Sequence, residues 1–344
     1  MNPIMMSIII SSLALGTVIT MSSTHWLMAW IGLEMNTLAI IPMIAKHHHP
    51  RATEATTKYF LVQATASATV LFSSSINAWS TGTWDIVQMT NPCACIMLTM
   101  ALSMKLGLAP LHFWLPEVLQ GASMKTALII TTWQKLAPMA LFYLTHHSLN
   151  TTALLTMGLM STMIGGWGGL NQTQTRKIMA YSSIAHLGWM ATILTLSPNL
   201  MLLNLTLYLM MTLSTFMLLI FSSSKTIKDL TTSWTISPST TTLMLLLLMS
   251  MAGLPPLTGF MPKWLILQDL TSHNLPTTAT LMALSALLSL FFYLRLTYTT
   301  TLTMSPTTTQ NKLKWRLQPK LKTTLLSMTA LMSTMLLPVT PMLT

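Results

Sequence analysis

Four charged side chains stand inside long apolar stretches of the sequence: Glu34, Lys105, Lys135 and Lys263. A charge in hydrocarbon costs about 3 kcal/mol or more and is kept when it is paired, hydrated or functional. Burial lowers the pKa of an amine and a nearby carboxylate raises it again, so a buried lysine can exchange a proton near neutral pH. Several such lysines joined by water predict a proton relay. The alternative is a structural ion pair between Glu34 and one lysine, although one acid cannot pair with three lysines.

Two histidines also lie within apolar stretches and could extend this relay. His112 follows a proline in one stretch and His186 lies midway along another. Imidazole titrates near neutrality, so either ring could pass a proton. The alternative for both is a hydrogen-bonded packing role. The run 47–49, three consecutive histidines, lies in a basic connection, and we expect these rings to be solvated.

Two of the apolar stretches are interrupted by the same pattern of residues. The sequences GLAPLHFWLPE at 107–117 and GLPPLTGFMPK at 253–263 share Gly-Leu-x-Pro-Leu-x-x-aromatic-x-Pro-charge. Proline removes a helical hydrogen bond, and the membrane tolerates this only where protein or a water-filled cavity satisfies the freed backbone groups. Interrupted segments at matching positions of two inverted repeats indicate an ion path in transporters. Two coincidental proline kinks are the alternative.

The elements that position these residues are predicted to be membrane-spanning helices. The 344 residues are 52% hydrophobic and 7% charged, whereas soluble proteins have about 25% charged residues. A spanning helix needs about 20 apolar residues. The apolar N-terminus lacks a basic region and a cleavage site, so it is interpreted as the first span and not as a signal peptide. Eleven spans are expected near 3–21, 25–44, 57–77, 93–116, 124–145, 150–170, 176–196, 199–223, 239–269, 276–298 and 323–342.

Lysines and arginines in the connections or at the edges of the spans all fall at alternate connections, on one side of the membrane. They are Lys46, Arg51, Lys58, Lys125, Arg176, Lys177, Lys225, Lys228, Arg295, Lys312, Lys314, Arg316, Lys320 and Lys322. These are 14 of the 17 basic residues, and the other three are the lysines within spans. The positive-inside rule therefore predicts the N-terminus inside and the C-terminus outside. The formal charge of +11 reflects this topology and not a nucleic-acid surface with interleaved aromatics.

The sequence contains no pattern typical of a bound cofactor. Cys93 and Cys95 are too few for a four-cysteine metal site and are expected to be a free, buried pair. Neither a G-x-G-x-x-G nor a Walker sequence is present, so no nucleotide site is predicted. We therefore expect no metal, nucleotide or redox group on this chain.

Six segments resemble one known family closely. They are WIGLEMN at 30–36, KYFLVQA at 58–64, MKLGLAPLHFWLPE at 104–117, WQKLAP at 133–138, GGLNQTQTRKIMAYS at 168–182 and GLPPLTGFMPKW at 253–264. The chain thereby resembles the NADH dehydrogenase subunit 2 family, the antiporter-like membrane subunits of respiratory complex I. The resemblance covers essentially the whole chain. The 32 methionines are also similar to the composition of proteins made in mitochondria.

This resemblance implies a fourteen-helix antiporter-like fold shortened to eleven spans, because longer relatives carry three further N-terminal helices. It implies two inverted five-helix repeats (1–145 and 150–298), a basic matrix loop (299–322) and a C-terminal helix (323–344). It assigns relay roles to Glu34, Lys105, Lys135 and Lys263.

The same resemblance implies a place in the mitochondrial inner membrane, with other membrane-arm subunits as partners. NADH, FMN, iron–sulfur clusters and ubiquinone are then expected on other subunits. The basic loops favour anionic lipids such as cardiolipin at the inner face. A stand-alone cation/proton antiporter and a non-pumping structural subunit are the alternatives.

Overall fold

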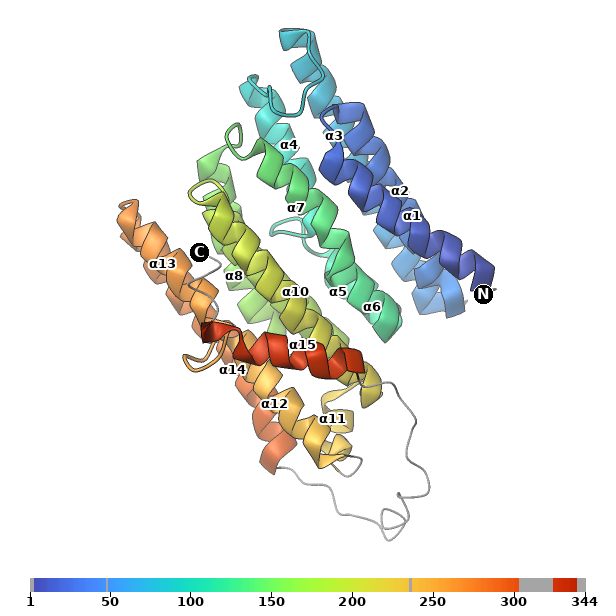
Figure 1. Ribbon diagram of the computed structural model, residues 1–344, viewed down its shortest axis with the longest axis vertical. Coiled ribbons are helices and arrows are strands. Elements are labelled where there is room, and N and C mark those ends of the chain that lie inside the picture. The colour runs from blue at the N-terminus through green and yellow to red at the C-terminus, as the bar shows by residue number, and fades with distance from the viewer. Residues whose placement is uncertain (1–2, 48, 235–236, 303–323, 339–344) are drawn as a thin grey trace. The chain divides into compact units, whose positions relative to one another are not determined.

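The computed structural model describes residues 3–47, 49–234, 237–302 and 324–338, and the regular elements in these ranges are all helices (Figure 1). They are α1 (Pro3–Ser22), α2 (Trp26–Ile44), the 3-10 turn η1 (Ala45–His47), α3 (Pro50–Thr81), α4 (Pro92–Leu106), α5 (Trp114–Gly121), α6 (Met124–Thr131), α7 (Trp133–Thr145), α8 (Thr151–Gly169), α9 (Thr175–Ile193), α10 (Pro198–Phe221), α11 (Ile227–Ser233), α12 (Pro238–Ala252), α13 (Phe260–Ser272), α14 (Pro276–Leu302) and α15 (Thr324–Met335). The predicted all-α class is therefore confirmed.

Six helical stretches among the described residues are long and apolar enough to cross a membrane. They are α1, α2, α3, α6 with α7, α10 and α14. Three shorter apolar helices accompany them, namely α4, α12 and the part of α15 from Leu326 to Met335. The membrane class is thus confirmed, whereas the number of eleven spans stays a prediction. Of the expected basic loop 299–322, residues 299–302 belong to α14 and the remainder lies outside the described residues.

The helices gather into two compact units. Unit 1 comprises Met1–Ser161 and Met190–Pro198, and unit 2 comprises Thr162–Trp189 and Asn199–Thr344. In unit 1, α3 packs against α2, α4 and α5, while α7 contacts α1, α4 and α6. In unit 2, α14 packs against α11, α12 and α13, and α15 lies on α12. Each unit is therefore organised around one long helix that contacts a broken one.

Serine and threonine are frequent in these helices because their hydroxyls bond within the same helix. Thr17 Oγ1 donates to Ala14 O at 2.8 Å, Ser73 Oγ to Val70 O at 2.8 Å and Ser103 Oγ to Met100 O at 2.7 Å. In an apolar medium an unpaired hydroxyl is costly, and such local bonds remove that cost. Polar residues can therefore line the interior of each unit.

The two predicted interruptions are confirmed, and their local geometry matches. Helices α4 and α12 each begin at a proline and each contain 15 residues. Gly107 ends α4 and Gly253 ends α12, both with φ of +82°. A left-handed residue at this position is favourable for glycine because it has no Cβ. The chain then runs without regular helix through 107–113 and 253–259 before α5 and α13 begin.

Other features differ from the sequence-based expectations. The expected fifth span is divided into α6 and α7 at Thr132, whose φ and ψ are −108° and −71°. Cys95 is buried, but Cys93 is exposed, so the prediction of a buried pair is wrong for Cys93. Two residues apart on a helix, their side chains point about 200° apart around the axis. One of the pair therefore faces outward when the other is inside.

The short helix α11 was also unexpected. Thr226 and Asp229 form a capping box, in which each side chain accepts a backbone N–H of the other residue. Burial raises the pKa of the Asp229 carboxyl, but the N–H groups of Thr226 and Lys225 outweigh this effect, so that its pKa lies below the usual value of 3.8. The Thr-x-x-Asp pattern is a recognised sign of a helix start and could have located α11.

Candidate functional site

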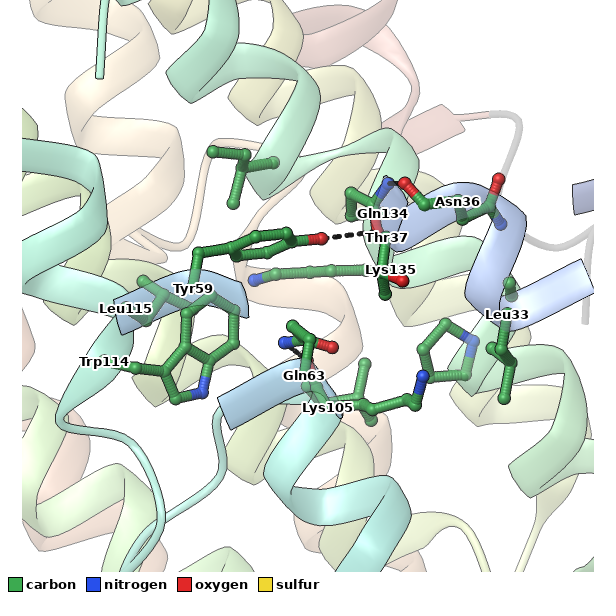
Figure 2. Close-up of a pocket in the computed structure, with 14 residues that line it drawn as sticks. Leu33, Asn36, Thr37, Tyr59, Gln63, Lys105, Trp114, Leu115, Gln134 and Lys135 are labelled. Atoms are coloured by element: carbon green, nitrogen blue, oxygen red, sulfur yellow. Dashed lines mark hydrogen bonds between the residues drawn. The ribbon is translucent and has the colours of Figure 1, made fainter. Parts of the chain in front are cut away.

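Unit 1 encloses a small polar cavity that is lined by residues of the six helices α2 to α7 (Figure 2). Its volume is about 10 Å³, about the room that one water molecule needs. The polar and charged residues of its lining are Asn36, Thr37, Tyr59, Gln63, Lys105, Gln134 and Lys135. Two of the four predicted relay residues, Lys105 and Lys135, therefore lie at one cavity.

Both lysines of this cavity are almost completely buried. Lys105 is 6% exposed and lies in the last turn of α4, just before the break. Its Nζ has no hydrogen-bond partner among the described residues. Lys135 is 3% exposed and lies in the first turn of α7, just after the division at Thr132. Each lysine thus lies beside an interruption of its helix. The break after Lys105 was predicted, whereas no sequence pattern predicted the division at Thr132.

Amide and aromatic side chains hold the backbone around the two lysines. Gln63 Nε2 donates to Lys105 O at 3.3 Å, and Trp114 Nε1 donates to Met104 O at 3.1 Å. These bonds satisfy carbonyls at the end of α4 that have no helical partner. The break is therefore stabilised by neutral donors.

A second pair of bonds joins α3, α7 and α2. Gln134 Nε2 donates to Asn36 O at 3.1 Å, and Tyr59 Oη donates to Gln134 Oε1 at 3.4 Å. Figure 2 shows these side chains around Lys105 and Lys135. Sequence reasoning missed Tyr59, Gln63 and Gln134. The spacing of Tyr59 and Gln63 by four residues in an apolar helix was a signal that both face one side.

Glu34 lies near this cavity but does not line it. It is half-buried on α2, and its Oε2 is buried without a hydrogen-bond partner among the described residues. In the same residues no ion pair joins Glu34 to a lysine. Its charge nevertheless acts electrostatically on Lys105 and on Tyr59. Glu34 is therefore placed to bias Lys105 through space, without a direct bond.

His112 lies in the break of unit 1, between α4 and α5. It is 3% exposed, and its ring stands 4.3 Å from that of Phe113, measured between centroids. Its Nδ1 has no hydrogen-bond partner among the described residues. His112 is not part of the cavity lining, so the structure brings it to the break but not to the lysines.

Unit 2 has a second small cavity, which contains the other two candidates. It is lined by Ser182, Ala185, His186, Trp189, Lys263, Ser289 and Tyr293. Lys263 Nζ donates to Ala252 O at 2.8 Å, and His186 is 6% exposed with its ring 5.5 Å from that of Tyr208. Four of the six predicted relay residues are thus divided between two cavities, Lys105 and Lys135 in unit 1 and His186 and Lys263 in unit 2, whereas Glu34 and His112 line neither. Among the described residues, no group of three His, Cys, Asp or Glu side chains could hold a metal ion.

One ion cluster lies outside both cavities and was not predicted. Lys58 Nζ lies 2.5 Å from Glu54 Oε1 and 2.5 Å from Glu117 Oε2. All three side chains are at least 40% exposed. The second contact ties α5, which follows the break, to α3.

Family models cover nearly the whole chain. Residues 23–289 match the model described as NADH:quinone oxidoreductase/Mrp antiporter, TM. Residues 290–344 match the model of the NADH dehydrogenase subunit 2 C-terminus. Both breaks and both cavities lie within residues 23–293 and so fall almost entirely in the first match.

Curated relatives are similar over their full lengths. The chain is 60% identical to NADH-ubiquinone oxidoreductase chain 2 of Xenopus laevis, with 99% of each chain covered. It is 59% identical to the protein of the same name from Latimeria chalumnae, over 99% of this chain and 98% of that one.

Solved structures show the same fold. A chain of respiratory complex I from Thermus thermophilus superposes with a TM-score of 0.78 at 25% identity, covering 96% of this chain and 78% of that one. A chain of the archaeal membrane-bound sulfane sulfur reductase gives a TM-score of 0.84 at 18% identity, covering 96% and 72%. The second likeness concerns the fold alone.

Proposed function

The chain belongs to the NADH-ubiquinone oxidoreductase chain 2 family, and from this premise we propose that its buried lysines carry protons through the membrane arm of respiratory complex I. As a member of that family it is a proton-translocating membrane subunit of an enzyme, NADH:ubiquinone oxidoreductase. The observation that carries the relay proposal is the cavity of unit 1. Two lysines there are at most 6% exposed and share one water-sized space with polar side chains.

The proposed mechanism is electrostatic. A lysine that is removed from water is poised between its charged and neutral forms, so a change in nearby charge shifts its proton. Glu34 acts on Lys105 through space and can provide such a change. A proton released by Lys105 can reach Lys135 through water in the common cavity. Gln63, Gln134 and Tyr59 keep the surrounding backbone in place while the charge moves.

Lys263 is proposed as the later relay group, from which the proton leaves to the outer side. The order from Glu34 and Lys105 through Lys135 to Lys263 rests on the family resemblance. Support from unit 2 is the cavity that Lys263 shares with His186, a second group able to hold a proton. His112, buried in the break of unit 1, is proposed as an accessory proton carrier.

The proposed topology has eleven spans in an antiporter-like fold, with inverted repeats at 1–145 and 150–298, a loop at 299–322 and a last helix at 323–344. The equal lengths of α4 and α12 and their left-handed terminal glycines support this repeat. The proposed location is the mitochondrial inner membrane, with the N-terminus in the matrix and the C-terminus in the intermembrane space.

We place NADH, FMN, the iron–sulfur clusters and ubiquinone on other subunits of the complex. Neighbouring membrane-arm subunits are the protein partners, as the complex I and related assemblies among the structural relatives support. Anionic lipids such as cardiolipin are proposed at the basic inner loops, because each exposed lysine or arginine near an anionic membrane surface contributes about 1 kcal/mol of attraction.

The test is the number of protons translocated per NADH oxidised by the reconstituted, fully assembled complex with Lys105→Met. Methionine keeps much of the length of the side chain but cannot hold a proton. We expect that ratio to fall, or oxidation and pumping to fall together by about tenfold or more. Lys125→Met, at an exposed lysine of α6, is the matched control. An unchanged ratio and rate in Lys105→Met would support a structural role in its place.

A further inference from the structure

The cavity of unit 2 contains a phenol that the relay described so far does not use. Tyr293 on α14 is 1% exposed and lines the cavity together with Lys263 of α13 and His186 of α9. The cavity volume is about 10 Å³, again about the room for one water. Three groups that can exchange protons therefore border one small space.

The hydroxyl of Tyr293 is buried, and among the described residues no hydrogen bond of normal geometry satisfies it. The Ser182 hydroxyl lies beside it but already donates to Met179 O at 2.8 Å, so it can act toward Tyr293 only as an acceptor. A buried tyrosine usually bonds its hydroxyl, since an unpaired one is costly. If Tyr293 only filled space, phenylalanine would serve better, as it does at Phe292.

Packing holds the phenol in a fixed position. Two residues further along α14, Arg295 Nη2 donates to Gln172 O at 2.5 Å, and Arg295 Nη1 donates to Leu170 O. The Phe292 ring packs closely on Gly169: a Cβ added to Gly169 would lie 2.7 Å from Cδ1 of the ring. These contacts hold the part of α14 that carries Tyr293 against the segment 169–172.

Lys263 and His186 are also held at this cavity. Lys263 Nζ uses one of the three N–H groups of its ammonium for Ala252 O, which leaves two for other acceptors. The ring of His186 packs against Tyr208 of α10, with 5.5 Å between the ring centroids. A proton donor, a proton acceptor and a hydroxyl therefore border the same cavity.

We propose that the Tyr293 hydroxyl passes the proton between Lys263 and His186, which deepens, and rests on, the proposed relay function. The Lys263 ammonium gives a proton to the Tyr293 oxygen, directly or through one water, while the Tyr293 hydroxyl gives its own proton to the neutral imidazole of His186. The O–H bond that breaks is replaced by the one that forms, so the phenol stays neutral. The net result is a positive charge moved from Lys263 to His186, and the reverse transfer restores the starting state.

The experiment is Tyr293→Phe in the assembled, reconstituted complex, with proton translocation and NADH oxidation measured together. Because only one hydroxyl is removed and the ring is kept, we expect normal assembly and thermal stability but coupled turnover lowered by about tenfold or more. Tyr298→Phe is the matched control, since this tyrosine lies on the same helix and is 62% exposed. It should behave as the unmodified complex.

Lys263→Met separates the failure of this inference from that of the relay itself. Normal pumping in Tyr293→Phe with defective pumping in Lys263→Met overturns the role of Tyr293 and leaves the relay function in place. Normal pumping in both variants overturns both. Loss of assembly in Tyr293→Phe also overturns the proposal, because it would show that the hydroxyl stabilises the fold.

Discussion

The breaks of the two units share a backbone but place their lysines on opposite sides of it. In unit 1, Lys105 precedes Gly107, whereas in unit 2, Lys263 follows Gly253 by ten residues. The position that matches Lys263 in the repeated motif is occupied in unit 1 by Glu117, whose carboxylate contacts Lys58. The same backbone geometry at the two breaks is therefore combined with two different arrangements of charged residues.

The donors that satisfy the open end of the helix differ accordingly. Neutral groups of Gln63 and Trp114 bond the last carbonyls of α4, and the Lys105 ammonium takes no part. At the end of α12 the donor is Lys263 itself, through Ala252 O. A helix C-terminus favours a cation, so this contact also stabilises the charge.

This difference indicates an anchored lysine in unit 2 and an unanchored one in unit 1. A neutral amine still has two N–H groups, so Lys263 can keep its bond to Ala252 O after losing a proton. Lys105 has no such bond among the described residues and depends on the more distant Glu34 for its charge balance. We therefore expect Lys105 to respond to charge changes nearby and Lys263 to hold its position through both protonation states.

The largest effect is expected from Gly253→Ala compared with Gly107→Ala. Both glycines have φ of +82°, so each substitution costs about 1–2 kcal/mol of strain. At Gly253 the new Cβ would also lie 2.9 Å from Lys263 Nζ and 3.1 Å from its Cδ, displacing the anchored lysine. At Gly107 it would lie 3.0 Å from Leu115 Cδ1 and 3.5 Å from Trp114 Cζ2, so the side chains that it meets first are apolar.

Thermal inactivation and protons per NADH of the assembled complex check this pair of variants. We expect both to lower the inactivation temperature, and Gly253→Ala to lower pumping further than its loss of stability explains. Equal pumping in the two variants would show that the position of Lys263 does not depend on Gly253.

The glycine and proline pattern made both of these breaks predictable, because the physical cause of each break is local. The division at Thr132 was not predictable in the same way. Neither Gly nor Pro stands there, and Pro138 lies within α7, which continues past it. Pro138 has no N–H to offer the carbonyl of Gln134, yet the helix continues through that position and divides at Thr132 instead.

The relay candidates show the same limit. Their types and apolar surroundings singled out Lys105, Lys135 and Lys263 from the sequence, but sequence alone could not say which of them share a cavity. Tyr293 escaped notice because an aromatic residue in an apolar helix is ordinary. Only the burial of its hydroxyl without a hydrogen bond of normal geometry distinguishes it, and burial depends on the fold.

A smaller effect is expected when one neutral donor of unit 1 is removed. Gln63→Leu leaves Lys105 O without its side-chain donor, which should lower stability by about 1 kcal/mol. Because Trp114 still bonds Met104 O, the break should persist, and turnover should fall less than in Lys105→Met. Thermal inactivation and coupled turnover of the two variants provide the comparison. A turnover loss as large as that of Lys105→Met would place the Gln63 amide in the proton path.

The smallest effect is expected at Glu117, which stands where the motif of unit 2 has Lys263. Its contact with Lys58 is exposed, and such ion pairs contribute little and weaken with salt. Glu117→Gln should therefore lower the inactivation temperature by about 1 °C at low salt, and the difference should vanish at high salt. Pumping should be retained, since neither Glu117 nor Lys58 borders either cavity. A defect in pumping that persists at high salt would mean that Glu117, at the motif position of unit 1, takes part in proton transfer as Lys263 is proposed to do in unit 2.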